Sequence, residues 1–223
     1  MQQQKNKKIF IYFFLFLIIG SINNKHLNSF KTPKIKEINI SGLDKDERIL
    51  LSKNLEFFKL KNLLFMDKKI LEKIINSNHY VEKYFVFKRY PSSLDIKIEK
   101  TKLLAYVNRN GNYFFLGSNK KFIKTNDITK NIPFIFGFFK KEDFFYFKKI
   151  IEDSNFELNE IEKLYFFPSG RWDLLTKSGI LIKLPKENIS DSIMLSQRIL
   201  NDKKFKNISL IDLRQKNQVI TNE

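Results

Sequence analysis

The stretch Tyr90-Pro91-Ser92-Ser93-Leu94-Asp95-Ile96-Lys97-Ile98-Glu99 decides the first half of the fold. From Leu94 onward, apolar and polar residues alternate strictly, which predicts a strand with one buried face. Residues 91–93 predict a tight turn, because proline and serine favour turn conformations. Residues 80–90 are rich in β-branched and aromatic side chains, which predicts a second strand. Together the two segments predict a pair of adjacent strands.

The residues before this pair predict one more strand and two helices. Residues 36–42 alternate and stop at a glycine, which is typical of a strand. Asp44 and Asp67 are candidate N-caps, and each precedes apolar residues at helical spacing. The order is therefore β-α-α-β-β, and we expect both helices to cover one face of a three-stranded sheet.

The second half predicts a mixed α/β module with an extended sheet, so the whole chain is assigned to the α+β class. An Asn110-Gly111 hairpin turn joins its first two strands. Residues 132–137 are expected to form a loop between a proline and a glycine, and Ser190-Asp191 is expected to cap a helix. The remaining expected elements are a helix over 142–153, strands over 161–167, 171–176, 180–184 and 208–212, and a last strand over 218–221.

The N-terminus combines lysines at 5, 7 and 8 with the uncharged run Ile9–Ile22. As a helix this run spans about 21 Å, which is shorter than the ~30 Å hydrocarbon core. Two interpretations remain, a cleaved signal peptide and a retained anchor. No Ala-x-Ala cleavage pattern follows the run, so we favour a transmembrane anchor over residues 9–25. The lysines predict a cytoplasmic N-terminus, which places the rest of the chain across the membrane.

The composition argues against most kinds of enzyme. The 223 residues include no cysteine and only two histidines, His26 and His79. A thiolate metal site, an iron–sulfur cluster and a histidine-rich metal site are excluded. The seven glycines never take the spacing of a nucleotide-binding loop. We therefore expect no catalytic residue, no cofactor, no metal and no small-molecule substrate.

The net charge of +17 invites an anionic partner. The lysines are dispersed among acidic and amide residues, however, and no nucleic-acid-binding motif is present. We therefore expect no nucleic acid as a partner. A genome-wide preference for Lys, Asn, Ile and Phe is an alternative explanation of the charge.

The first module resembles a POTRA domain. The likeness lies in the strand that ends at Gly42, the two helices, the Tyr80-Val81 pair, and Tyr90-Pro91 followed by Leu94, Ile96, Ile98 and Glu99. A POTRA-like module behind a single basic-flanked anchor resembles the FtsQ/DivIB family of bacterial cell-division proteins. Tyr90-Pro91 stands where that family usually has Trp-Pro, and Tyr80 where it commonly has Trp.

The second module continues the resemblance. The family pattern is matched by Pro133 with Gly137, by Arg171-Trp172-Asp173-Leu174, by Gly179, by Leu184-Pro185 and by Asp212-Leu213-Arg214. One departure is the turn Gly117-Ser118-Asn119-Lys120, where the family commonly has Asp-x-x-Gly. Asn119 tolerates positive φ, so we expect that residue to preserve the turn.

The resemblance implies a domain plan and a function. The plan is a cytoplasmic tail (1–8), an anchor (9–25), a linker (26–33), a POTRA domain (34–101) and an FtsQ-type β domain (102–223). The implied function is a non-enzymatic scaffold of the divisome, located in the inner membrane at the septum with its C-terminus in the periplasm. The implied partners are the FtsB–FtsL complex and other division proteins, through which septal peptidoglycan synthesis is controlled. The alternative is a membrane-anchored basic periplasmic enzyme or adaptor unrelated to division.

The expected partner-binding site is the C-terminal edge of the sheet. An edge strand offers unpaired backbone groups to which a partner strand can be added. Arg214 has two interpretations, a contact with a partner carboxylate and a structural pair with Asp212. Trp172, the only tryptophan, is expected in the core rather than at an interface. The candidate partner-binding residues are Arg214, Gln215, Gln218, Val219, Ile220 and Thr221.

Overall fold

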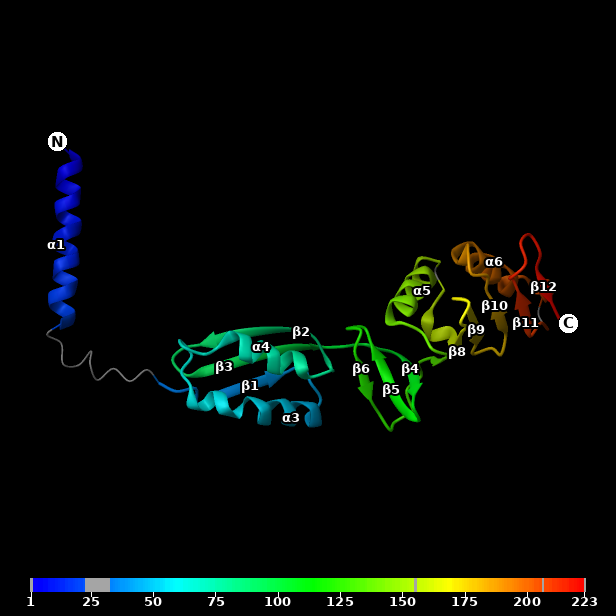
Figure 1. The fold of residues 1–223 in the computed structure, drawn as a ribbon, viewed down its shortest axis with the longest axis horizontal. Coiled ribbons are helices and arrows are strands. Elements are labelled where there is room, and N and C mark those ends of the chain that lie inside the picture. Colours follow the sequence, from blue (N-terminus) through cyan, green and yellow to red (C-terminus); the bar gives the residue numbers. More distant parts are fainter. Residues whose placement is uncertain (1, 23–32, 155, 206, 223) are drawn as a thin grey trace.

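The computed structural model describes residues 2–22, 33–154, 156–205 and 207–222. After the helix α1 (Gln2–Ile22), the chain forms one unit around a three-stranded sheet and a second around a nine-stranded sheet (Figure 1). Two large hydrophobic clusters of buried side chains lie one in each unit. The chain beyond α1 therefore has two cores.

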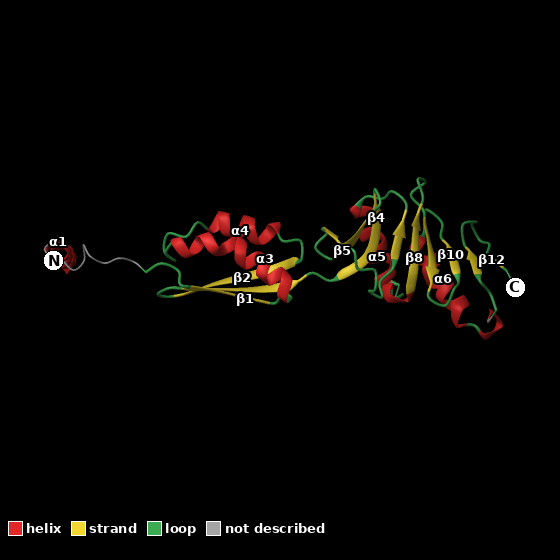
Figure 2. Cartoon of the chain, turned by 90° about the horizontal axis from the view of Figure 1, so that it is seen from below, coloured by secondary structure: helices red, strands yellow, loops and turns green. Residues whose placement is uncertain are grey.

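The first unit has the predicted β-α-α-β-β order. Its sheet has the order β1-β3-β2, in which β1 (Glu37–Ser41) is parallel to β3 (Ser93–Lys100) and β2 (Val81–Arg89) is antiparallel to β3. The helices α3 (Lys45–Leu55) and α4 (Lys68–Ser77) lie on one face of this sheet (Figure 2), and the 3-10 turn η1 (Glu56–Leu60) follows α3.

The helices of the first unit begin where the sequence predicted. The Asp67 carboxylate accepts hydrogen bonds from the backbone of Lys69 at 2.8 Å and of Ile70 at 3.3 Å. The backbone N–H of Asp44 donates to Glu47 Oε2 at 2.9 Å. These bonds satisfy donors that a helix start otherwise leaves unpaired. Both N-cap predictions are confirmed.

The second unit contains a sheet with the strand order β12-β11-β10-β9-β8-β7-β4-β5-β6. Parallel and antiparallel pairs are mixed, since β4 is parallel to β7, β7 to β8, and β10 to β11. The strands are β4 (Leu103–Arg109), β5 (Asn112–Gly117), β6 (Phe122–Lys124), β7 (Phe134–Phe136), β8 (Ile161–Phe166), β9 (Trp172–Thr176), β10 (Leu181–Lys183), β11 (Leu210–Asp212) and β12 (Ile220–Thr221). Short 3-10 turns occur at Leu158–Glu160 and Lys203–Phe205.

The helices α5 (Lys141–Asp153) and α6 (Ile189–Asn201) supply the other half of the second core. Phe144, Phe147 and Ile151 of α5 are fully buried. The Trp172 ring is 2% exposed and stacks on the Phe147 ring with 4.9 Å between centroids. The expectation that Trp172 belongs to the core is therefore confirmed.

The loop expected over residues 132–137 is wrong in part. Phe134–Phe136 forms β7, which lies between β4 and β8 in the middle of the sheet. The run is only three residues long, and its flanking proline and glycine made it resemble a loop. Parallel pairing on both sides stabilises it, and that pairing depends on residues far away in the sequence.

Three smaller expectations also need correction. At the 117–120 turn Lys120, not Asn119, has the positive φ of 61°. Helix α6 begins at Ile189, after Asn188 in a left-handed conformation, so Ser190-Asp191 lies inside the helix rather than capping it. The last strand comprises Ile220–Thr221 alone, and the preceding two residues of the predicted strand lie outside it.

Asn119 has another role, at the junction of the two units. Its side-chain Nδ2 donates to the carbonyls of His79 at 2.8 Å and Val81 at 2.9 Å, and its Oδ1 accepts from the Lys121 backbone at 3.0 Å. Nearby, His79 Nδ1 lies 2.9 Å from the Phe122 carbonyl. A side chain of the second unit thereby pairs with the backbone of the first.

The predicted anchor falls on α1 and on residues 23–25, which lie outside the described residues. Large apolar side chains of α1 from Ile9 to Ile19 are between 37% and 75% exposed. Among the helices that the structure describes, none combines the length and the apolar character needed to cross a membrane.

Two glycines of the second unit differ in how close other backbone atoms lie to them. Gly137 and Gly111 both have positive φ, at 98° and 78°. A Cβ at Gly137 would lie 2.1 Å from the Phe166 carbonyl oxygen, whereas a Cβ at Gly111 would meet nothing within 4 Å. We expect Gly111→Ala to cost about 1 kcal/mol of unfolding free energy from backbone strain. Gly137→Ala should cost more than ~3 kcal/mol, because the clash adds to that strain.

Urea unfolding of a chain that begins at residue 33 measures both costs, with the Gly111 variant as the matched control. Equal losses in the two variants would contradict the close approach of β7 and β8.

Candidate functional site

The strand β12 forms one end of the nine-stranded sheet and pairs only with β11 in the part of the chain that the structure describes. Ile220 lies opposite Asp212, and Thr221 lies opposite Ile211. The side chain of Asn222 bonds to Ser209, through Nδ2 to Oγ at 2.7 Å and through Oδ1 to the backbone N–H at 3.1 Å. The other long side of β12 therefore remains available for pairing.

A hollow of about 660 Å³ lies beside β12, between the turn that precedes this strand and the start of α6. Val219 is 42% exposed at its wall, and Ile220 next to it is 45% exposed. Arg214, Gln215 and Gln218 also line the hollow. The structure thus brings four of the six predicted residues to one hollow and puts the other two, Ile220 and Thr221, in the edge strand itself.

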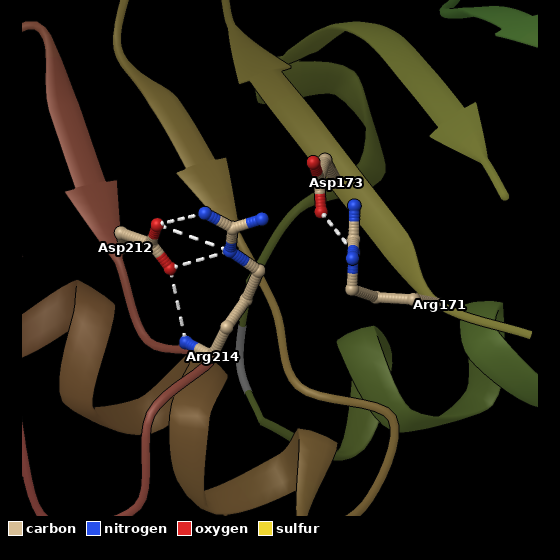
Figure 3. Close-up of polar contacts among 4 residues, drawn as sticks. All are labelled: Arg171, Asp173, Asp212 and Arg214. Carbon is tan, nitrogen blue, oxygen red and sulfur yellow. Dashed lines mark hydrogen bonds and ion pairs between the residues drawn. The ribbon is translucent and has the colours of Figure 1, made fainter. Parts of the chain in front are cut away.

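Next to this edge, two arginine–aspartate pairs lie on the sheet face opposite α5 and α6 (Figure 3). In β9, Trp172 and Leu174 point into the core, so Asp173 between them points to the opposite face. In β11, Ile211 belongs to the core and Asp212 takes the opposite side for the same reason. Lys183 of β10 lies between the two acids, because it is opposite Asp173 in β9 on one side and opposite Asp212 in β11 on the other.

Arg214 binds Asp212 with several hydrogen bonds. Its Nε donates to Oδ1 at 2.8 Å and to Oδ2 at 3.0 Å, and its Nη2 donates to Oδ2 at 2.5 Å. The Arg214 backbone N–H also donates to Oδ1, at 3.1 Å. These hydrogen bonds from Arg214 hold the pKa of the Asp212 carboxyl below its usual value. Arg214 therefore forms the structural pair with Asp212, which was one of its two predicted roles.

Arg171 and Asp173 form a looser pair, with Arg171 Nε donating to Asp173 Oδ1 at 3.2 Å. The Asp173 side chain is only 6% exposed. Burial raises the pKa of Asp173, and the attraction of Arg171 only partly offsets it. The two acids therefore have opposite pKa shifts, although each has an arginine partner.

Arg171 and Asp173 are not among the six partner-binding residues predicted from the sequence. A signal for them was present, since Arg171-Trp172-Asp173 and Asp212-Leu213-Arg214 both carry opposite charges at i and i+2 around a large apolar residue. In a strand, this spacing puts both charges on one face and the apolar residue on the other. Across the described residues, no group of three or more acidic or histidine side chains is arranged to hold a metal ion.

The opposite pKa shifts predict opposite pH dependences of stability. The pKa of Asp212 is lowered in the folded state, so its contribution to stability is complete above the usual carboxyl pKa of 3.8 and is lost as the pH falls through the folded pKa. Asp173 has a raised folded pKa, so stability falls as the pH rises from 3.8 through that pKa. Urea unfolding at pH values below and above 3.8 measures both effects. Asp212→Asn should lose less unfolding free energy than the parent as the pH falls below 3.8, and Asp173→Asn should lose less as the pH rises above 3.8. Identical pH profiles for the two variants would contradict these shifts.

The C-terminal domain model of the FtsQ/DivIB cell division proteins matches residues 100–214, which is just over half of the chain. The match covers both arginine–aspartate pairs and stops before β12. The cell division protein FtsQ of Rickettsia bellii (strain RML369-C) is 22% identical over 193 residues, which are 83% of this chain and 70% of that protein.

A solved structure is also similar, that of the major extracytoplasmic domain of the trans isomer of cell division protein DivIB from Geobacillus stearothermophilus. The likeness covers 47% of this chain and 99% of that one, with 14% identity and a TM-score of 0.32. At that TM-score, it adds nothing to the assignment. The family model, which matches the second unit up to Arg214 and just over half of the chain, decides the assignment: this chain belongs to the FtsQ/DivIB family of cell division proteins.

Proposed function

We propose that the chain is a non-enzymatic scaffold of the divisome that binds the FtsB–FtsL complex through the C-terminal edge of its nine-stranded sheet. The observation that carries the proposal is β12, which ends the sheet and pairs on one side only among the described residues. An edge strand recruits a partner strand by backbone hydrogen bonds, and neighbouring side-chain pockets give the pairing its specificity. The hollow beside Val219 supplies such a pocket.

Arg214 supports the proposal because part of its guanidinium is not used in the pair with Asp212. Nε and Nη2 bind Asp212, while Nη1 has no hydrogen-bond partner in the part of the chain that the structure describes. The Arg214 side chain is 41% exposed. A partner carboxylate that reaches past β12 onto the charged face of the sheet therefore finds a charged donor that Asp212 already holds in position (Figure 3).

The membrane attachment proposed for the chain concerns α1. Exposed apolar side chains from Ile9 to Ile19, preceded by lysines at 5, 7 and 8, support attachment of this helix to a membrane. We place its N-terminus in the cytoplasm and the two units in the periplasm, at the inner membrane of the division septum. We also propose that residues 34–101 are a POTRA domain and that residues 102–223 are the FtsQ-type β domain.

Partner binding should be lost when the edge is blocked. Val219→Pro removes a backbone donor next to β12, so capture of the FtsB–FtsL complex should fall to background. Arg214→Ala should weaken capture by about 1–3 kcal/mol through loss of a charge-assisted contact. Lys124→Ala is the matched control, since it removes the same charge from β6 at the opposite edge of the sheet and should bind as the parent does.

Pull-down with a chain that begins at residue 33 measures capture, and circular dichroism shows whether each variant is folded. Asp212→Asn separates the two roles of Arg214, because it removes the internal pair and leaves the guanidinium available. Parent-like capture by folded Val219→Pro and Arg214→Ala variants would exclude this edge as the binding site.

The anchor should be retained in the mature protein, because no Ala-x-Ala pattern follows the apolar run. The intact mass of the membrane-extracted protein should therefore include residues 1–25. A mature species that starts between Gly20 and Asn28 would show that the segment is a cleaved signal peptide.

A further inference from the structure

The first unit exposes a cluster of large apolar side chains at one end. Leu60 is 70% exposed, Leu64 57%, Phe65 79% and Tyr90 62%. Leu60 is the last residue of η1, Leu64 and Phe65 lie between η1 and α4, and Tyr90 belongs to the turn between β2 and β3. We call these four residues the apolar tip. Exposed apolar clusters mark contact sites, because each such side chain leaves hydrophobic surface in water.

The backbone holds the tip in place. Leu63 and Met66, on either side of Leu64 and Phe65, are buried in the core of the first unit. The Phe65 N–H donates to Asn62 Oδ1 at 2.9 Å, and Lys88 Nζ donates to the Leu63 carbonyl at 2.5 Å. The exposure of Leu64 and Phe65 is therefore a consequence of a fixed local structure.

The chain that follows α1 joins the first unit at this same end (Figure 1). Lys34 forms a β-bridge with Asn62, and the Ile35 N–H donates to the Lys61 carbonyl at 2.9 Å. The Lys36 N–H donates to the Ser92 carbonyl at 2.8 Å, beside Tyr90. Residues 23–32 separate the tip from α1, and ten residues reach at most about 36 Å. The tip therefore lies at the end of the first unit that is joined to α1 through these ten residues.

The charge around the tip is positive. The lysines at 34, 36, 59, 61 and 88 are exposed there. The nearby Asp67 carboxylate caps α4, and Arg89 pairs with Asp95. Apolar side chains surrounded by lysines are typical of surfaces that insert into the headgroup region of an anionic bilayer.

We propose that the apolar tip is a second membrane contact, which inserts into the surface of an anionic lipid bilayer and holds the first unit against it. The inference rests on the membrane attachment proposed for α1. Insertion of the tip would fix the orientation of the first unit relative to the bilayer.

The absence of cysteine from the chain allows a direct test. Phe65→Cys carries a polarity-sensitive fluorophore in the full chain, mixed with vesicles that contain phosphatidylglycerol. Phe138→Cys is the matched control, since Phe138 is 99% exposed in the second unit. We expect a blue shift and quenching by a lipid-borne quencher at position 65, and neither at position 138. Equal responses at the two positions would overturn the proposal.

Removal of positive charge next to the tip gives a second readout. In the Phe65→Cys background, Lys59→Gln with Lys61→Gln should lower the apparent docking equilibrium about fivefold per lysine. Lys124→Gln with Lys216→Gln is the control pair, with the same loss of charge in the second unit. An unchanged signal in both pairs would contradict the role of the lysines.

Vesicle flotation of the full chain tests α1 separately. Flotation with a silent label at position 65 would overturn the tip and leave the attachment of α1 intact. Failure of the full chain to float would overturn both.

Discussion

The nine-stranded sheet packs against α5 and α6 on one face, carries a smaller buried cluster around Tyr106 on the other, and is open at both ends. The two open ends shape the rest of the second unit. Its core strands are buried beneath α5 and α6, through Trp172, Leu174 and their neighbours. An open sheet must end in strands whose backbone groups lack a neighbour. The β6 end lies near the junction with the first unit, where His79 contacts the Phe122 carbonyl. The β12 end lies at the other end of the sheet, away from this junction (Figure 1).

The arginine–aspartate pairs explain how so short an edge strand is held. β12 has two residues, too few to stabilise itself by pairing alone. Asp212 lies opposite Ile220 and binds both the backbone and the guanidinium of Arg214, which fixes the chain where it leaves β11. Arg171 and Asp173 continue the same charged face two strands away. The same contacts that order the turn hold the Arg214 guanidinium on the β10 side of Asp212, between Asp212 and Asp173 (Figure 3).

Much of this fold was predictable because local patterns and tertiary structure agree. Strict alternation predicted β3, and Asp67 predicted the start of α4. The sequence could not reveal β7, because three residues stabilised by distant neighbours carry no period of their own. Asn119 shows the same limit, since its bonds to His79 and Val81 join residues about forty positions apart. Within the candidate site the edge was predictable from the order of the strands, whereas the hollow depends on the packing of α6.

The central claim is that the partner adds a strand to β12. Hydrogen–deuterium exchange of the folded protein, with and without the FtsB–FtsL complex, tests it most directly. The account predicts that the backbone amides of residues 218–221 become protected when the complex is bound, while those of β6 at the opposite edge do not change. Protection confined to the first unit or to the helices, with residues 218–221 exchanging as fast as in the free chain, would contradict it.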